Sequence, residues 1–72
     1  MKLVISVGVF PVSLDTATIQ SDEYLFLDLG TEVEEVSTEL ENPDINLYKV
    51  ISGQEAGKHF VMTKKDAQTH LT

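Results

Sequence analysis

The feature that most constrains this fold is a stretch over residues 46–62, in which two β-patterned runs flank a loop with two glycines. The runs, residues 45–51 and 58–62, are rich in β-branched and aromatic side chains, which favour strands. Gly53 and Gly57 can adopt the positive φ angles that a hairpin loop with a bulge requires. The sequence therefore predicts a β-hairpin on which the rest of the chain packs.

The length and the cysteine content limit how the chain can be stabilised. It has 72 residues and no cysteine, which predicts one domain over residues 1–72 without a disulfide framework or a thiolate metal site. A domain this small buries only about 60% of the surface that its unfolded chain exposes. Its stability must therefore come from compact packing or from association.

The N-terminal residues predict further β structure. Residues 2–7 are dense in β-branched side chains and indicate a buried strand, Gly8 offers a bend, and residues 9–14 continue the β character. Pro11 cannot donate a ladder hydrogen bond and should lie at an edge or a kink. The apolar start is also similar to the apolar region of a short signal peptide, but the residues that follow make a poor cleavage site, so a buried strand is the favoured interpretation.

Residues 24–29 alternate in character and predict a strand with two different faces. One face consists of leucines and is expected to join the core: Leu25, Leu27 and Leu29. The opposite face carries Tyr24, Phe26 and Asp28. In a small barrel this second face is either open to water or a partner, or it packs in a second small core with the N-terminal strand.

Residues 31–41 fit two interpretations. As a helix they have a capping box at Thr31 and Glu34, and their apolar side chains fall at near-helical spacing. As a strand they need one bulge between Val33 and Val36 to keep both valines on one face. We predict the strand, because β-branched residues are frequent here, and keep an α+β fold with a helix at 31–41 as the alternative.

The segments beside the hairpin complete a mostly β chain. Asn42-Pro43-Asp44 is a strong turn signal before it. After it, Thr63 stands at an N-cap position with Asp66 three residues later, which predicts one short helical turn over residues 63–67. Residues 68–71 are then expected to form a short closing strand.

The charges are divided unequally along the chain. The formal net charge is −7, and ten of the 12 acidic residues fall between Asp15 and Asp44, where there is no lysine or arginine. Such a charge disfavours nucleic acid and anionic membranes as partners, because both are polyanions. It favours a protein partner with a basic surface.

Patterns of catalytic or metal-binding residues are missing from the sequence. His59 and His70 are the only imidazoles, and neither a metal-ligand spacing nor a serine nucleophile elbow nor a phosphate-binding loop is present. We therefore expect no enzymatic activity, no cofactor and no metal ion.

Glycines and apolar residues from Leu29 onward follow a recognisable order: Leu29-Gly30-Thr31, Leu47-Tyr48-Lys49-Val50-Ile51, Ala56-Gly57-Lys58 and Lys64-Lys65-Asp66-Ala67. This order resembles that of SH3-like small β-barrels, and the hairpin loop is similar to the KOW element of ribosomal proteins and transcription elongation factors. The resemblance implies a small barrel with an RNA- or polymerase-binding hairpin. His59-Phe60 replaces the glycine expected after Lys58, so we carry over the turn shape and not the RNA function.

The function expected from these features is non-enzymatic protein binding. The candidate contact residues are acids and aromatics of the central segment: Asp22, Glu23, Tyr24, Phe26, Asp28, Glu32, Glu34, Glu35 and Glu39. In size and acidity the chain resembles small inhibitors and accessory factors of bacteriophages, some of which block enzymes that hold DNA or RNA. That resemblance implies action in the host cytoplasm on a basic, nucleic-acid-binding surface, where carboxylates replace phosphates.

Two alternatives stay open at this point. One is a KOW-like module that binds nucleic acid or polymerase through a cluster of lysines: Lys49, Lys58, Lys64 and Lys65. The other is a structural or assembly subunit whose exposed strands pair with copies of itself.

Overall fold

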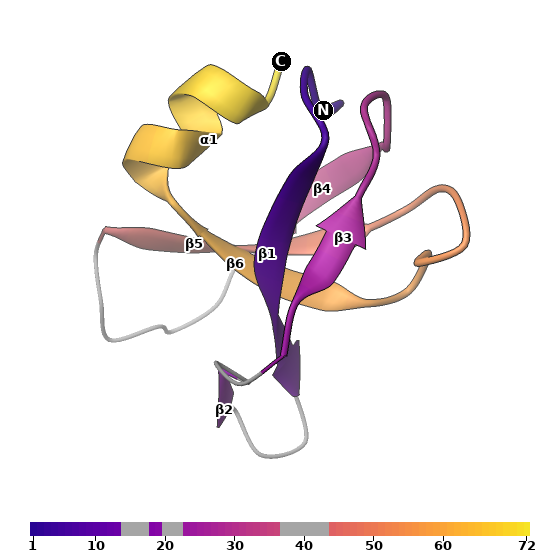
Figure 1. Ribbon diagram of the computed structural model, residues 1–72. Helices are drawn as coiled ribbons and strands as arrows, with labels where there is room; N and C mark the ends of the chain where they lie inside the picture. Colours follow the sequence, from indigo (N-terminus) through magenta and orange to yellow (C-terminus); the bar gives the residue numbers. More distant parts are fainter. Residues whose placement is uncertain (14–17, 20–22, 37–43) are drawn as a thin grey trace.

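The computed structural model describes residues 1–13, 18–19, 23–36 and 44–72, and these residues are mostly β (Figure 1). They form six strands followed by one helix: β1 (Val7–Ser13), β2 (Thr18–Ile19), β3 (Leu25–Leu27), β4 (Val33–Val36), β5 (Ile45–Val50), β6 (His59–Thr63) and α1 (Lys64–His70). The sheet has the order β2-β1-β6-β5-β4, and β3 also pairs with β1. The paired strands are antiparallel. This confirms the predicted mostly β chain with one short helix near its C-terminal end.

The predicted hairpin is formed by β5 and β6. Its ladder runs from the pair Ile45↔Thr63 to the pair Lys49↔His59. In the loop, Gly53 and Gly57 have φ angles of 83° and 95°. These are left-handed values that glycine adopts without the steric cost of a Cβ atom. The local glycine pattern therefore located both the turn and the strands that it joins.

The ambiguous segment is a strand where the structure describes it. In β4, Val33 pairs with Val50 and Val36 pairs with Leu47, with one residue opposite one residue throughout. The helix interpretation is therefore wrong for Val33–Val36, and the expected bulge is absent from these residues. Without it, the two valines point to opposite faces of the sheet: Val33 is buried in the core and Val36 is half-buried on the other side. Residues 37–41 lie outside the described part of the chain.

Residues 1–4 form a connection, here called the N-terminal clasp, rather than the start of a long strand. Leu3 N–H donates to Thr31 O at 3.0 Å, and Val4 N–H donates to His70 O at 2.8 Å. The clasp thus joins the turn before β4 to the end of α1, and Figure 1 shows these parts close together. The prediction of a buried strand over residues 2–7 is wrong, because β1 begins at Val7 and Val4 and Ile5 are exposed.

Pro11 lies inside β1, where the strand changes neighbours. β3 pairs with Val7 to Val9, β2 pairs with Val12 and Ser13, and Pro11 pairs with Phe60 of β6. Within the described residues Pro11 therefore has a ladder partner on one side, which suits a residue without an N–H group.

The C-terminal helix begins as predicted and continues further. Asp66 N–H donates to Thr63 Oγ1 at 3.1 Å, so Thr63 is the N-cap. Helix α1 extends to His70, and the predicted closing strand over residues 68–71 is wrong. Only Leu71 makes a β-bridge, with Leu3 of the N-terminal clasp.

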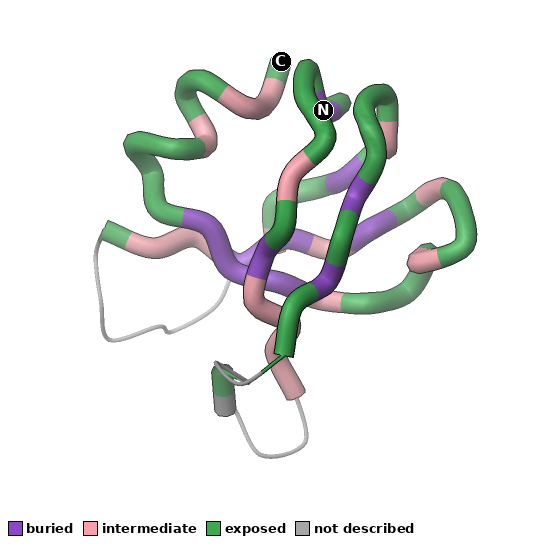
Figure 2. Tube along the Cα trace, viewed as in Figure 1, coloured by how far each residue is buried: buried purple, intermediate pink, exposed green. Residues whose placement is uncertain are grey.

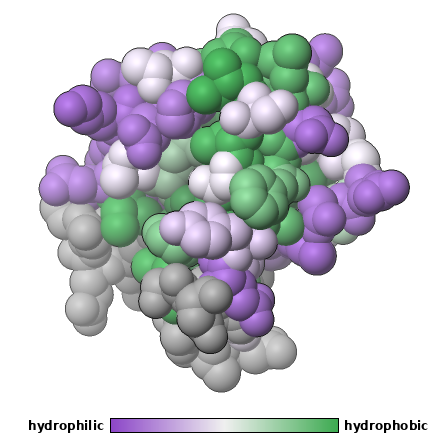
Figure 3. Space-filling model, in the orientation of Figure 1, coloured by the Kyte–Doolittle hydropathy of each residue, from purple (hydrophilic) through white to green (hydrophobic). Residues whose placement is uncertain are grey.

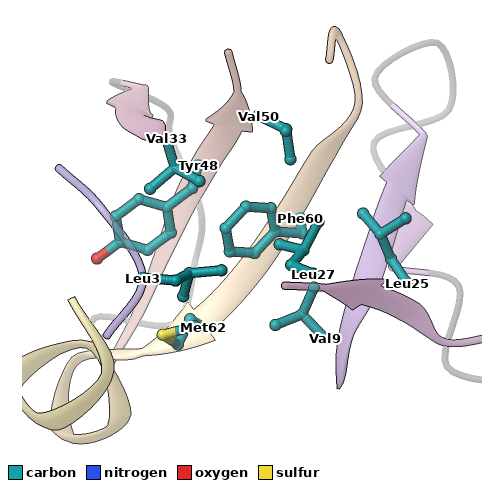
Figure 4. Packing of buried hydrophobic residues seen from close by; sticks show 9 residues of the cluster. All are labelled: Leu3, Val9, Leu25, Leu27, Val33, Tyr48, Val50, Phe60 and Met62. Atoms are coloured by element: carbon teal, nitrogen blue, oxygen red, sulfur yellow. The ribbon is translucent and has the colours of Figure 1, made fainter. Parts of the chain in front are cut away.

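One hydrophobic core fills the space between the strands (Figures 2 and 4). Its buried members come from the clasp and from five of the strands: Leu3, Val9, Leu25, Leu27, Val33, Tyr48, Val50, Phe60 and Met62. The rings of Tyr48 and Phe60 stack with their centroids 5.4 Å apart. Leu29, which was expected in the core, is 64% exposed, because β3 ends at Leu27 and the chain turns there.

Candidate functional site

The outward side of β3 carries the most exposed aromatic side chains of the described residues. In the ladder with β1, Gly8 lies opposite Phe26, while Leu25 and Leu27 on either side of Phe26 turn into the core. Phe26 is 76% exposed and Tyr24 is 65% exposed. The sequence predicted a leucine side and an aromatic side for this segment. The structure confirms this division for Tyr24 and for the three residues of β3, Leu25, Phe26 and Leu27.

Three aromatic rings form a continuous surface, which we call the aromatic face: Phe10, Tyr24 and Phe26. The ring centroids of Phe10 and Tyr24 are 5.2 Å apart, and those of Tyr24 and Phe26 are 6.2 Å apart. Beneath them lies Gly8, where a Cβ atom would be 3.2 Å from Phe26 Cε1 and 3.5 Å from Tyr24 Cδ1. The absence of a side chain at Gly8 therefore lets both rings lie against β1.

An apolar groove of about 260 Å³ adjoins the aromatic face. It is lined mainly by β1, the end of β6 and α1, with Ile19 of β2 and Ile45 of β5. Phe10 belongs to both the groove and the aromatic face, and Gly8 beneath the rings also lines the groove. Figure 3 shows apolar surface gathered in the middle of this view, with polar surface around it. Polar groups enter the groove from α1: Asp66 and His70, the Nδ1 atom of which is buried without a hydrogen-bond partner in the described residues.

A smaller, more polar depression, the Asp28 hollow, adjoins the Phe26 end of the aromatic face. It has a volume of about 120 Å³ and lies between the end of β3 and the hairpin loop. Its walls are Phe26, Leu27, Asp28, Thr31, Ser52, Gly53, Gln54 and Glu55. Ser52 Oγ accepts a hydrogen bond from Glu32 N–H at 2.9 Å, which holds the loop against the segment before β4.

Comparison with known proteins gives no relative. No protein-family model matches the chain, and no curated protein or solved structure shows a significant match.

The structure separates the predicted contact residues into two groups. All those that it describes are exposed: Glu23, Tyr24, Phe26, Asp28, Glu32, Glu34 and Glu35. It brings Tyr24 and Phe26 together and places Asp28 beside Phe26 in the hollow. Glu32, Glu34 and Glu35 belong to β4 or to the residue before it, and β4 pairs with β5 rather than with β3. Asp22 and Glu39 lie outside the described residues.

Two lysines distant in the sequence lie next to two of these acids. Lys2 Nζ is 3.8 Å from Glu32 Oε1, and Lys49 stands opposite Glu34 in the β4–β5 ladder. A third lysine, Lys58, forms an ion pair at 2.5 Å with a local acid outside the predicted set, Glu55, three residues before it. Glu32 and Glu34 therefore belong to a mixed surface, although no lysine lies near them in the sequence.

Gly8 and Phe10 were not predicted as site residues. The sequence did indicate that Phe10 could be exposed. Val9 and Phe10 are adjacent apolar residues in one strand, and one of the two must face away from the core. Nothing local indicated that Phe10 would meet Tyr24, since that contact depends on how β1 and β3 pair.

The described residues lack two kinds of functional feature. They contain no group of three or more histidine, aspartate or glutamate side chains placed to hold a metal ion. They also form no helix that combines the length and the apolar character needed to cross a membrane.

Proposed function

We propose that this chain is a non-enzymatic protein-binding module that contacts its partner through the aromatic face. The observation that carries the proposal is the exposure of Phe26 and Tyr24, at 76% and 65%, in one stack with Phe10. A chain this small has few large apolar side chains with which to build a core. Contiguous exposed aromatic rings are typical of interaction sites, where buried aromatic anchors supply much of the binding energy.

The groove beside the aromatic face suits such a contact. Its lining is mostly apolar, and Phe10 and Gly8 make it continuous with the exposed rings. An apolar side chain of the partner that enters this groove would lose its contact with water, while the partner's backbone crosses Tyr24 and Phe26. Interfaces commonly combine a filled pocket with a flatter surrounding surface in this way.

The charge of the chain supports a basic surface on the partner. The net charge is −7, and Glu23 and Asp28 flank the two exposed rings in the sequence. Attraction between opposite charges would speed association and orient the partner, whereas nucleic acid would be repelled. The partner surface that we propose is one that normally binds nucleic acid, so that the bound module competes with DNA or RNA in the manner of a small phage inhibitor.

The first experiment is affinity capture with the tagged chain and with the double variant Tyr24→Ser, Phe26→Ser. Ile51→Ser is the matched control, because Ile51 is also an exposed large apolar residue but does not belong to the aromatic face. We expect the same protein to be captured by the unaltered chain and by the control, and to be lost with the double variant. Equal capture by all three proteins would overturn the proposal.

The second experiment measures what kind of partner the face recognises. The dissociation constant for the captured protein is determined between low and high ionic strength, and we expect it to rise with salt because the attraction between surface charges is screened. Sedimentation velocity and a gel-shift assay with RNA and DNA accompany it. A stable oligomer that depends on Phe26, or tight binding of nucleic acid at low salt, would favour the assembly subunit or the KOW-like module instead.

A further inference from the structure

We infer that the Asp28 hollow binds an arginine side chain of the partner, so that the module recognises a cationic residue next to the aromatic face. The inference rests on the proposed protein-binding function. It adds to that function a second recognition element, separate from the groove, with its own ligand chemistry.

The hollow has a negative charge that the described residues do not neutralise. The Asp28 carboxylate has no ion-pair or hydrogen-bond partner among them. Glu55, the other acid of the hollow, already pairs with Lys58. Asp28 is therefore the group with which an incoming cation would pair, and its exposure means that little desolvation opposes that pairing.

The remaining walls fit a planar cation better than a spherical one. Phe26 offers an exposed ring at the edge of the hollow, over which a guanidinium group can stack. Thr31, Ser52 and Gln54 line the same hollow, and their side chains carry oxygens that can accept hydrogen bonds; Ser52 Oγ already accepts one from Glu32 N–H. A guanidinium has five N–H donors in one plane, so it can contact the carboxylate and these oxygens while it stacks, whereas a lysine ammonium cannot do all three.

The hollow is positioned to work together with the aromatic face. Phe26 lines the hollow and Phe10 lines the groove, and the Tyr24 ring packs against both of these rings. A partner segment that places an apolar residue in the groove and an arginine in the hollow would cross the aromatic face between them. Because the groove and the hollow accept different kinds of side chain, the bound segment would cross the aromatic face in one orientation only.

The test is an NMR titration of the whole chain with N-acetylarginine amide as the probe. N-acetylcitrulline amide, which has the same shape without the charge, and N-acetyllysine amide are titrated in parallel. The variants are Asp28→Asn, Phe26→Leu and the charge-matched control Glu35→Gln, since Glu35 is exposed on β4 and does not line the hollow. Dispersed amide spectra establish that each variant is folded.

We expect the arginine probe to shift amides of residues 26–31 and 52–55, with weak, millimolar-range affinity suited to a single side chain. Asp28→Asn should weaken this binding by about twofold to fivefold, because an ion pair that is exposed to water is lost. Glu35→Gln should leave it unchanged, and citrulline should not bind. Phe26→Leu should reduce the preference for arginine over lysine, since the stacking surface is gone.

Three results would overturn the inference: no shifts in the hollow, equal effects of Asp28→Asn and Glu35→Gln, or lysine bound as tightly as arginine by the unaltered chain. These outcomes are separable from a failure of the proposed function. Capture that depends on Tyr24 and Phe26 but not on Asp28 would leave the aromatic face as the binding surface and remove only the arginine site.

Discussion

Phe26 lies directly over Gly8, the residue opposite it in the β1–β3 ladder, so that a Cβ atom at Gly8 would be only 3.2 Å from Phe26 Cε1. Glycine is unfavourable in a strand because it loses more backbone freedom on folding and adds no packing. Here it provides the flat floor on which the Phe26 ring and the Tyr24 ring rest. The exposed rings are thus supported by the strand beneath them.

Replacing this glycine tests the support directly. Gly8→Val should leave the fold intact and change the free energy of unfolding by no more than about 1 kcal/mol, since valine favours strands and no positive φ is required at this position. The added methyl groups should displace the Phe26 ring and weaken partner capture. The measurement is the set of NOEs between the Phe26 ring and residues of β1, with Gly8→Ala as a smaller step. Unchanged ring NOEs together with unchanged capture would contradict this account.

Phe60 provides the opposite case of an aromatic residue that holds the fold together. It has no exposed surface and stacks on Tyr48 in the centre of the core (Figure 4). Phe60→Ala should cost about 3–5 kcal/mol, through lost burial and the cavity that it leaves. Domains of this kind have about 5–15 kcal/mol in total, so the variant should be largely destabilised.

Urea denaturation followed by circular dichroism measures this loss. Phe26→Ala is the control, because it removes the same side chain from an exposed position, and its unfolding midpoint should stay close to that of the unaltered chain. If the two substitutions shifted the midpoint equally, Phe26 would have to be part of the core and the aromatic face would not exist as described.

The loop of the hairpin depends on the backbone conformation of Gly57. Its φ angle is 95°, and its N–H donates to Val50 O at 2.8 Å, which closes the loop. Gly57→Ala should destabilise the fold by about 1–2 kcal/mol, because an L-residue is strained at such an angle. Thermal unfolding compares it with Gln54→Ala, an exposed position of the same loop without a positive φ, which should change the melting temperature little. Equal melting temperatures for the two variants would refute the assigned loop conformation.

The features predicted correctly from the sequence are those set by neighbouring residues. The hairpin follows from Gly53 and Gly57 between two β-prone runs, and the helix start follows from the Thr63 hydroxyl, which can reach the Asp66 amide within one turn. The two sides of β3 follow from strict alternation at Leu25, Phe26 and Leu27. In each case the physical cause acts over a few residues, so the local pattern contains it.

The features that were missed depend on contacts between distant segments. Val33 and Val36 were expected on one face because both are apolar, but each meets a different apolar neighbour across β5, so no bulge is needed. The Asp28 hollow is made by residues 26–31 and 52–55, which only the folded chain brings together. The expected segment of unbalanced acids also differs for this reason, since Lys2 Nζ lies 3.8 Å from Glu32 Oε1 and Lys49 is the ladder partner of Glu34.

The N-terminal clasp is the clearest of these long-range features, and Leu3 is its buried residue. The Leu3 side chain is 2% exposed, its N–H donates to Thr31 O, and its carbonyl oxygen accepts from Gly30 N–H at 2.9 Å. Leu3→Ala should therefore cost about 2–5 kcal/mol, whereas Ile5→Ala, two residues later at an exposed position, should cost almost nothing.

Amide hydrogen exchange then shows which part of the fold the clasp holds. In Leu3→Ala the amide of Gly30 should exchange faster than the amides in the β5–β6 ladder, because the clasp joins the turn before β4 to the end of α1 while the hairpin has its own hydrogen bonds. The amide of Thr72, which donates to Lys2 O at 3.0 Å, should follow Gly30. A uniform rise in exchange across the chain would instead mean that the clasp and the hairpin unfold as one cooperative unit. In that case Leu3 would stabilise the whole fold as a core residue, and not only the N-terminal clasp.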